Sequence, residues 1–373
     1  MQARSKHPIR RTLAAIGLAA ASVAAGLAVP TPAQAAPQEA YSDALVFWPT
    51  SSSTLVAWRN GVKTTKTVTP AAWGVSGQMA GPPGANVMLY NPGSAADTLV
   101  RVTPQGAAGV TLSTKSAPVS GNYRPLVGDF DGNTIDDIFW YGAGSTPDYI
   151  WLFDNAGNHT TKSVTINGSY RPVVVDTGFS GADDIIWYGP GSAPDAMWRF
   201  DDSGNHTSIS MTIGGNYIPI VGNFGSYDSG VRDLQVVWYN PAGPDSLWAF
   251  LDDGTHWSNA LPALDGDRTP VVGRFASSTF NEAIIWYRPG TASEAMWVFN
   301  TDGVATSVSA PTVNGTFVPA VGDFDNNGYD DIAWSGAGTA TIWKFTAAGH
   351  TQTVINGLPA DAMPVTVRPS YVF

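Results

Sequence analysis

The chain contains no cysteine and few basic residues, and each of these absences excludes a class of protein. Its 373 residues include 19 lysines and arginines against 30 aspartates and glutamates, a formal net charge of −11. Without a basic surplus, nucleic-acid binding is not expected, and an anionic membrane surface should repel the protein. Without cysteine, no disulfide can form, so stability has to come from core burial and bound metal.

Long apolar runs are also absent, except near the N-terminus. Residues 1–36 combine a basic start, an apolar stretch at 12–29 and an Ala-x-Ala cleavage site at 32–36. This arrangement predicts a secretory signal peptide; the alternative is a membrane anchor, but the segment is Ala-rich and ends in a cleavage site. No other run approaches the roughly 20 apolar residues that a membrane span needs.

We therefore expect a signal peptide at 1–36 and a single secreted domain at 37–373 without a membrane span. Four of the basic residues and none of the acids lie in the signal segment. The remaining domain has 15 basic against 30 acidic residues, a net charge of −15.

The chain repeats one pattern about every 48 residues. A period of 40 to 50 residues with several short β-runs per unit is the signature of a β-propeller blade. Five complete units begin at Asn122, Ser169, Asn216, Arg268 and Thr316.

One unit shows the pattern of a blade. Arg124–Gly128 is a short run that can line the propeller axis, and 138–141 is continuously apolar, as expected of a strand buried on both faces. A third strand is expected at 149–153. Residues 158–166 alternate polar and apolar positions, which predicts an outer strand with one solvated face. Four antiparallel strands make the blade.

The ends of the chain predict how the ring closes. A degenerate copy of the repeat covers 70–118. The N-terminal unit supplies strands at 44–49 and 55–61 but lacks a first strand. A spare first strand lies at 363–367. We therefore expect an all-β, seven-bladed propeller of four-stranded antiparallel blades, in which the C-terminal strand completes the N-terminal blade; six or eight blades are the alternatives. Closure removes the sheet edges that invite aggregation.

Two loops carry a metal-ligand spacing at the same phase of their units. Oxygen side chains at positions 1, 3, 5 and 9, with a backbone carbonyl at position 7, converge on one point, and hard oxygen donors suit Ca²⁺. Mg²⁺ would demand a stricter octahedron and more retained water, and a hydrogen-bonded turn without metal is the other alternative. The predicted ligands are Asp129, Asp131, Asn133, Ile135 and Asp137 in one loop and Asp323, Asp325, Asn327, Tyr329 and Asp331 in the other.

Another loop, at 176–184, is degenerate. Asp176 and Asp184 keep positions 1 and 9, but Gly178 and Ser180 fill positions 3 and 5. The sequence leaves open whether this loop binds metal.

The repeat resembles a known family. The run FDGNTIDDI at 130–138 and its counterpart FDNNGYDDI at 324–332 resemble the FG-GAP/VCBS repeat of integrin α-subunit heads. The resemblance covers nearly all of the chain after residue 36. The chain is also similar to seven-bladed fungal lectins with integrin-like calcium loops and to VCBS-type repeats of secreted actinobacterial proteins. This implies calcium on one face and ligand recognition on the other face or between blades.

Candidate ligand-binding residues precede the first and third strands of several units. In a propeller these two loops emerge on the same face, so an aromatic ring, an arginine and a carboxylate could line one shallow sugar pocket per blade junction. The alternative is that arginine and aspartate pair to tie neighbouring blades together. The candidates are Tyr123, Arg124, Asp148, Tyr170, Arg171, Asp195, Tyr217 and Asp245.

Histidines and tryptophans also recur with the period. The four histidines that follow the third hairpin turn sit on different blades, so they cannot converge on one site and are expected to be surface residues. The paired tryptophans are expected to fill the space between blades; the alternative is that some flank sugar sites. The histidines are His159, His206, His256 and His350.

No catalytic motif is present: the chain has no Gly-x-Ser-x-Gly elbow, no His-Glu-x-x-His, no phosphate-binding loop and no cysteine nucleophile. We therefore predict a non-enzymatic, calcium-binding recognition module that binds an extracellular glycan, with weak single sites multiplied by multivalency. One alternative is a subunit that binds a secreted protein partner, such as the lectin component of a bacterial umbrella-like toxin particle. The other is a polysaccharide hydrolase or lyase.

Overall fold

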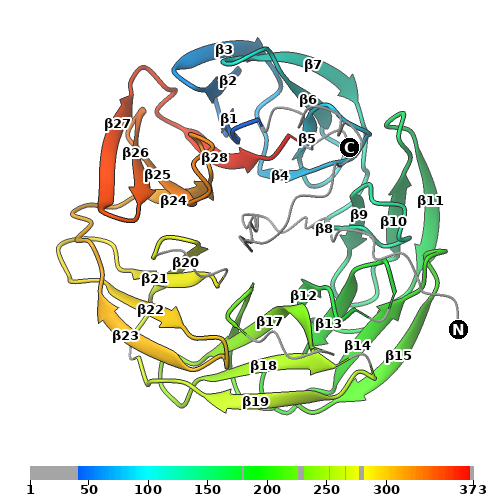
Figure 1. The fold of residues 1–373 in the computed structure, drawn as a ribbon. Coiled ribbons are helices and arrows are strands. Elements are labelled where there is room, and N and C mark those ends of the chain that lie inside the picture. The colour runs from blue at the N-terminus through cyan, green and yellow to red at the C-terminus, as the bar shows by residue number, and fades with distance from the viewer. Residues whose placement is uncertain are drawn as a thin grey trace, which may run out of the picture.

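Seven small sheets stand around a common axis in the computed structural model (Figure 1). The structure describes residues 41–178, 180–225, 231–251, 253–264, 266–276 and 281–369. Within them, 28 strands form seven four-stranded antiparallel sheets. This confirms the predicted seven-bladed propeller. The predicted signal peptide lies outside the described residues.

Blade 1 is assembled from both ends of the chain, and each later blade uses four consecutive strands that run outward from the axis. Blade 1 comprises β28 (Ala362–Val367), β1 (Ala44–Pro49), β2 (Thr54–Arg59) and β3 (Val62–Thr67); blade 2 comprises β4 (Trp73–Gly77), β5 (Ala85–Tyr90), β6 (Thr98–Pro104) and β7 (Val110–Ser116); blade 3 comprises β8 (Arg124–Gly128), β9 (Asp137–Tyr141), β10 (Asp148–Phe153) and β11 (His159–Val164).

The remaining four blades follow the same order. Blade 4 comprises β12 (Arg171–Val175), β13 (Asp184–Tyr188), β14 (Asp195–Phe200) and β15 (His206–Met211); blade 5 comprises β16 (Ile218–Gly222), β17 (Val231–Tyr239), β18 (Ser246–Leu251) and β19 (His256–Ala260); blade 6 comprises β20 (Thr269–Gly273), β21 (Ala283–Tyr287), β22 (Ala295–Phe299) and β23 (Ala305–Ser309); blade 7 comprises β24 (Val318–Gly322), β25 (Asp331–Gly336), β26 (Thr339–Thr346) and β27 (Gly349–Ile355).

The ring closes by strand exchange, as predicted. β28 pairs antiparallel with β1 over six residue pairs, and the red strand lies beside the blue one in Figure 1. The connection is reinforced by Asp361, whose carboxylate accepts hydrogen bonds from the backbone N–H groups of Ser51 and Ser52 at 2.6 and 2.8 Å. The two ends of the chain therefore hold one blade together.

The core lies between the blades, where aromatic side chains from neighbouring sheets meet. Every residue of β9 is buried, whereas β11 has mostly exposed positions, which fits a strand with one solvated face. Trp140 packs against Tyr90 of the preceding blade and against Trp151 of its own, both at 5.1 Å between ring centroids. This confirms that tryptophans fill the space between blades. The fully buried ones are Trp140, Trp187, Trp238, Trp286 and Trp297.

The blades are also joined by a repeated pair of hydrogen bonds. Asp183 donates its N–H to the carbonyl of Asp129 in the preceding blade at 2.6 Å, and its carboxylate accepts the N–H of Asp129 at 2.9 Å. Asp43 forms the same pair of bonds with Asp323, at 2.9 and 3.0 Å, across the closing junction. The first residue of each loop is thereby tied to the next blade.

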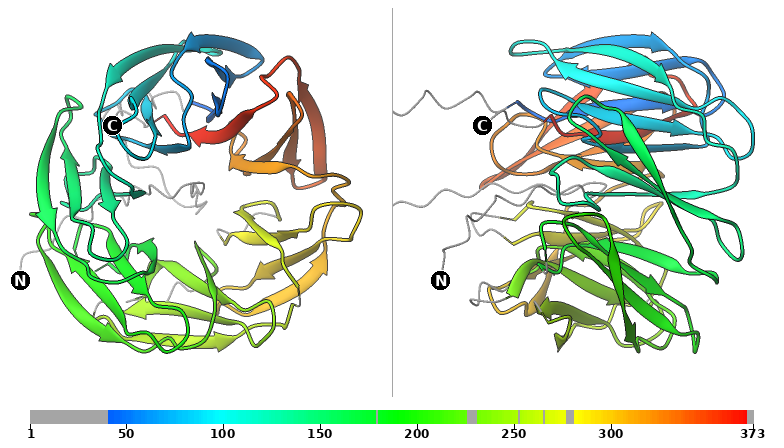
Figure 2. Two further views of the ribbon diagram at one scale, coloured as in Figure 1. Left: turned by 180° about the vertical axis from the view of Figure 1, so that it is seen from behind. Right: turned by 90° about the vertical axis from the view of Figure 1, so that its right-hand side faces the viewer.

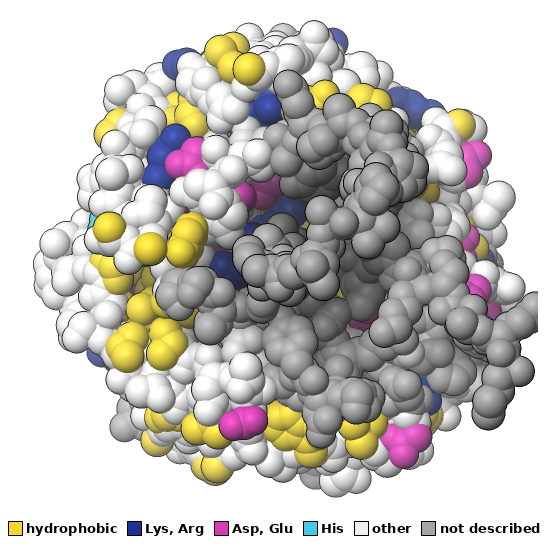
Figure 3. All heavy atoms as spheres, in the orientation of Figure 1, with side chains coloured by type: hydrophobic (Ala, Val, Ile, Leu, Met, Phe, Trp, Pro, Cys, Tyr) yellow, Lys and Arg dark blue, Asp and Glu magenta, His cyan; other side chains and the backbone are white. Residues whose placement is uncertain are grey.

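The topology gives the ring two distinct faces (Figure 2). Loops from first to second strands and the third hairpin turns lie on one face, which we call the loop face. The connections between blades and the loops from second to third strands lie on the other, which we call the connector face. In the orientation of Figure 1, acidic and basic side chains lie next to one another towards the centre of the ring (Figure 3). No helix within the described ranges is long and apolar enough to cross a membrane.

Candidate metal centres and the connector face

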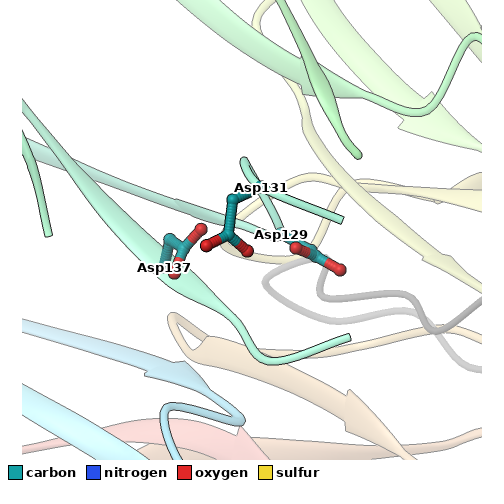
Figure 4. Close-up of side chains that lie close together, drawn as sticks. All are labelled: Asp129, Asp131 and Asp137. Carbon is teal, nitrogen blue, oxygen red and sulfur yellow. The ribbon is translucent and has the colours of Figure 1, made fainter. Parts of the chain in front are cut away.

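Two loops on the loop face each bring three carboxylates together. In the first loop, residues 129–137, one oxygen from each of Asp129, Asp131 and Asp137 lies within 4.8 Å of the others, and the three side chains converge in Figure 4. The second loop, residues 323–331, gathers three carboxylates within the same limit. Among the described residues, these are the clusters of metal-ligating side chains, and they lie at the predicted positions.

Both loops have the same backbone shape although their sequences differ. In the first loop Gly132 and Thr134, at positions 4 and 6, have φ of 70° and 71°; in the second loop Asn326 and Gly328 have φ of 61° and 88°. Positive φ is a conformation that glycine and asparagine tolerate best. In both loops the two left-handed residues flank the asparagine at position 5, Asn133 or Asn327.

The carboxylate at position 1 is held by the loop's own backbone. Asp129 accepts the N–H of Asn133 at 3.1 Å with Oδ1 and the N–H of Thr134 at 2.7 Å with Oδ2. The corresponding bonds of Asp323 measure 3.0 and 2.9 Å. This carboxylate is fixed in place before any ion binds.

The carboxylate at position 9 is buried and anchors the loop to its blade. Asp137 accepts the N–H of Phe130 within the loop at 2.9 Å and the N–H of Phe153 in β10 at 2.8 Å. Asp331 makes the equivalent bonds at 3.0 and 2.9 Å. Both aspartates are fully buried. This residue can therefore stabilise the fold as well as bind a cation.

The asparagine at position 5 presents its oxygen to the loop. Asn133 donates its side-chain amide to the carbonyl of Phe153 at 2.8 Å, and its Oδ1 accepts the N–H of Ile135 at 2.7 Å. The second loop repeats both bonds at 2.8 and 2.7 Å. An amide oxygen has two lone pairs, so it can also bind a cation. That the carbonyls of Ile135 and Tyr329 are ligands stays a prediction.

The electrostatics of both loops favour a bound cation. Burial, reinforced by the neighbouring carboxylates, raises the pKa of Asp137 to about 9 and that of Asp331 to about 8. Burial also raises the pKa of Asp129 to about 6. In the second loop, Asp325 Oδ1 is buried without a hydrogen-bond donor. A divalent cation would supply the missing partner, and an all-oxygen donor set suits a hard cation.

In the degenerate loop of blade 4, Gly178 and Ser180 take positions 3 and 5, and hydroxyl groups form hydrogen bonds within the blade. Ser180 takes the position of the asparagine and donates to the carbonyl of Phe200 at 2.7 Å, while Thr177 donates its hydroxyl to Asp184. Of the positions that carry the predicted ligands in the two acidic loops, only 1 and 9 keep a carboxylate, in Asp176 and Asp184, while the carboxylate of Asp183 accepts the N–H of Asp129 in the preceding blade.

In blade 2, the loop between the first and second strands is held by the guanidinium group of Arg101, whereas the equivalent loops of blades 3 and 7 carry the acidic clusters. Arg101 donates to the carbonyls of Gly81 and Pro83, the latter at 2.9 Å, in the loop that follows β4. The loop contains a cis peptide bond between Pro82 and Pro83. Arg101 lies on β6, outside the repeated loop pattern, so the sequence pattern does not indicate this role.

On the connector face, the three carboxylates predicted to bind ligand close loops instead of facing solvent. Asp148 is fully buried and accepts the N–H groups of Gly142 and Ile166 at 2.7 and 2.9 Å. Asp195 makes the equivalent bonds at 2.8 and 2.7 Å. Asp245, also buried, accepts the N–H of Asn240 at 2.7 Å. Their assignment as ligand-binding residues stays a prediction, and the structure gives them a structural role.

The tyrosines predicted to bind ligand are half-buried, and the backbone N–H of each is hydrogen-bonded to a tyrosine hydroxyl of the preceding blade. The hydroxyl of Tyr141 donates to the carbonyl of Gly168 at 2.9 Å and accepts the N–H of Tyr170 at 2.8 Å. Tyr90 and Tyr188 hold Tyr123 and Tyr217 in the same way. The arginines beside the first two tyrosines, Arg124 and Arg171, are exposed, and Arg171 donates to the carbonyl of Tyr217 at 2.7 Å.

The histidines lie on separate blades, as expected, but each also stacks on a tryptophan of the adjacent strand. His206 lies 3.8 Å from Trp198 between ring centroids, with 12° between the planes. Burial lowers the pKa of His206, so the imidazole is held in its neutral form. The other stacked pairs are His159 with Trp151, His256 with Trp248 and His350 with Trp343.

Comparison with known proteins supports the fold alone. No family model and no curated protein sequence matches the chain. Among solved structures, a protein from Lactobacillus plantarum matches with a TM-score of 0.54 and 9% identity, over 87% of this chain and 99% of that one. A functionally unknown protein from Desulfotomaculum acetoxidans matches with a TM-score of 0.52 and 11% identity, over 88% and 100%.

A third match is weaker. An ACO/RPE65 chimera aligns with a TM-score of 0.45 and 10% identity, over 88% of this chain and 89% of that one. A similarity this low bears on catalysis in neither direction.

Proposed function

We propose that the protein is a secreted, calcium-binding propeller of the FG-GAP/VCBS type that recognises a ligand rather than catalysing a reaction. The observation that carries the calcium assignment is the duplicated loop. Two blades place three carboxylates and an amide oxygen at the same positions, on the same backbone, with the same hydrogen bonds. Packing alone does not require two separate loops to gather negative charge in this way.

Calcium suits these loops better than magnesium. The donors are fixed by backbone hydrogen bonds, and carboxylate, amide and carbonyl oxygens together supply more ligands than a protein usually gives to Mg²⁺. Mg²⁺ usually keeps several waters and binds through one or two carboxylates.

The calcium proposal is tested by thermal unfolding of residues 37–373 in millimolar calcium and in chelator. An ion that binds only the folded state must stabilise it, so chelation should lower the melting temperature. The double variant Asp131→Ala with Asp325→Ala should lose this sensitivity, because each change removes a side-chain ligand from one loop. The exposed Asp267→Ala is the matched control and should respond like the unaltered protein. Identical melting in calcium and chelator would refute the proposal.

A glycan is the ligand class that the connector face favours. Half-buried aromatic rings recur there at successive blade junctions, beside exposed arginines, and can stack against the C–H faces of sugars. Because Asp148 and Asp195 are occupied by backbone N–H groups, arginines and main-chain groups would have to supply the polar contacts.

Screening residues 37–373 on a glycan array, in calcium, tests this part of the proposal. Binding to one family of sugars is the expected result. A folded protein that binds no glycan would contradict it and favour the alternative, a protein-interaction subunit of a secreted assembly.

A further inference from the structure

The innermost strands place seven equivalent residues around the axis on the connector face. Each stands near the start of its strand and pairs with the residue near the end of the second strand of the same blade. We call this set the axial ring. Its members, in blade order, are Met363, Trp73, Arg124, Arg171, Ile218, Thr269 and Val318.

The axial ring is uneven: Trp73, Arg124 and Arg171 stand on three consecutive blades, a group that we call the arc, whereas the exposed Val318 lies apart on blade 7. Trp73, Arg124, Arg171 and Ile218 belong to blades 2 to 5 in order. The two arginines are exposed, and Trp73 and Ile218 are 45% and 38% exposed. The ring contains no acid, although residues 37–373 carry a net charge of −15. Trp73 offers an exposed aromatic face on the blade next to Arg124.

The two guanidinium groups repel each other without a compensating carboxylate. Although Arg124 is exposed as a residue, partial desolvation of its guanidinium group lowers its pKa, Tyr141 opposes this effect, and repulsion by Arg171 lowers the pKa further. Among the described residues, no carboxylate forms a salt bridge with either arginine. The hydrogen bond from Arg171 to the carbonyl of Tyr217 restricts one of the two side chains. An anion placed here would relieve the repulsion.

The chemistry of the arc selects a ligand with two features. A guanidinium group binds a carboxylate through two parallel hydrogen bonds, which gives both strength and direction. The exposed indole of Trp73, on the blade next to Arg124, offers a flat apolar surface. A pyranose ring that carries a carboxylate presents an apolar face and an anion at a fixed separation.

We propose that the axial ring binds an acidic saccharide, with its carboxylate between Arg124 and Arg171 and its sugar ring against Trp73. This rests on the proposed glycan recognition and names the ligand class and the place. The proposal also predicts the stoichiometry. Because Trp73, Arg124 and Arg171 occur together once in the axial ring, one saccharide should bind per protein, instead of one per blade junction. An acidic peptide would satisfy the arginines, but its flexible carboxylates would not hold a flat face against Trp73.

Isothermal titration calorimetry of residues 37–373, in millimolar calcium, tests the proposal with three probes. They are a trisaccharide of glucuronic acid, its carboxyl-reduced neutral counterpart, and hexaglutamate. We expect one trisaccharide to bind per protein and the reduced form to bind about tenfold more weakly or less, because charge-assisted hydrogen bonds are lost.

Variants locate the site. The double variant Arg124→Gln with Arg171→Gln should weaken trisaccharide binding by about tenfold or more. Trp73→Ala should weaken it several-fold without changing its dependence on the carboxylate. Arg288→Gln, an exposed arginine in a connector-face loop of blade 6, removes the same charge and should have no effect. Unchanged melting temperatures would show that the variants remain folded.

The outcomes separate this inference from the proposed function. Equal binding of the acidic and neutral trisaccharides, or unchanged binding by the double arginine variant, would overturn the axial site and leave glycan recognition standing. Arginine-dependent binding of hexaglutamate without saccharide binding would overturn it in favour of an acidic peptide. A folded protein that binds neither trisaccharide, nor any glycan on the array, would overturn both proposals.

Discussion

The carboxylate at position 9 of each acidic loop holds the loop to its blade and is also a ligand in the proposed calcium site, and a substitution can separate these two roles. Asp137 is fully buried, and both of its oxygens accept backbone N–H groups. The side-chain NH₂ group of an asparagine would face one of these two backbone N–H groups, and that backbone N–H would lose its acceptor. We expect Asp137→Asn to lower the free energy of unfolding in chelator by about 1–3 kcal/mol. Asp131→Ala should cost far less, because Asp131 is only partly buried.

Denaturant unfolding in chelator measures both variants without a contribution from the ion. Equal and small effects would show that Asp137 contributes as a ligand only.

A lysine beside the second cluster should make that site the weaker one. Lys344 Nζ lies 3.8 Å from Asp325 Oδ2. In blade 3 the equivalent position, which follows Trp151, is occupied by the uncharged Leu152. A cation must compete with the ammonium group for the same carboxylate. We expect Lys344→Met to strengthen calcium binding at the second loop several-fold.

Calorimetric titration with calcium in an Asp131→Ala background isolates the second loop, since that change disables the first. An affinity that is unchanged or weaker would show that Lys344 does not compete.

At the residue scale, the sequence predicted the acidic clusters but not the roles of the other carboxylates. Asp129 and Asp137 could be predicted because they hold positions 1 and 9 of a loop whose ligand spacing is the same in two blades. Asp148 was expected to face a ligand, yet its partners, Gly142 and Ile166, lie 6 and 18 residues away, and only the folded backbone brings them together. A carboxylate that closes a loop and one that faces solvent look alike in sequence.

At the scale of elements, the blade order and the strand exchange were predicted correctly because each unit could be aligned with the others. The residues at which individual strands end were predicted less accurately. The outer strand of blade 3 was expected at 158–166 but ends at Val164. The reason is that the N–H of Ile166 bonds to the carboxylate of Asp148 instead of continuing the ladder. A side chain that competes for one backbone donor can end a strand, and no local pattern reveals it.

Strand exchange makes β28 essential to the ring. Deleting residues 362–373 would leave β1 with an open edge and remove one strand of blade 1. We expect this truncated chain to lose cooperative unfolding and to aggregate, because an unpaired, buried strand edge recruits other chains.

Size-exclusion chromatography and thermal unfolding would show both effects. Deletion of residues 370–373 alone, which spares β28, is the control and should behave like the unaltered protein. A monomeric, cooperatively folded protein after the longer deletion would contradict the expectation.

At the scale of the whole molecule, the two acidic loops are hydrogen-bonded to the neighbouring blades. The main chain of Asp129 is bonded to Asp183 of the next blade, and that of Asp323 to Asp43 across the closing junction. An ion that fixes either loop therefore also fixes a junction. Calcium in blade 7 would stabilise the point where both ends of the chain meet, so its removal should lower the stability of the entire ring.

The pH dependence of this stabilisation follows from the carboxylates of the two loops. Without an ion, burial raises the pKa of Asp129, Asp331 and Asp137 to about 6, 8 and 9, from 3.8 in the unfolded chain. The folded state then binds more protons than the unfolded state from the unfolded pKa of 3.8 up to each raised pKa. Their contribution to stability is therefore present at low pH and is lost as pH rises from 3.8, completely for Asp129 near pH 6 and for Asp137 near pH 9.

Calcium bound as proposed would reverse this trend, because it would bind only the ionised carboxylates and would have to displace their protons at low pH. The difference in melting temperature between calcium and chelator should therefore widen as pH rises from about 6 to about 9, the range set by Asp129 and Asp137. Thermal unfolding across this range, in both conditions, measures it. The double variant Asp131→Ala with Asp325→Ala should show a flat difference near zero. A difference that narrows with rising pH would mean that the ion does not compete with protons for these loops, and that its site lies elsewhere.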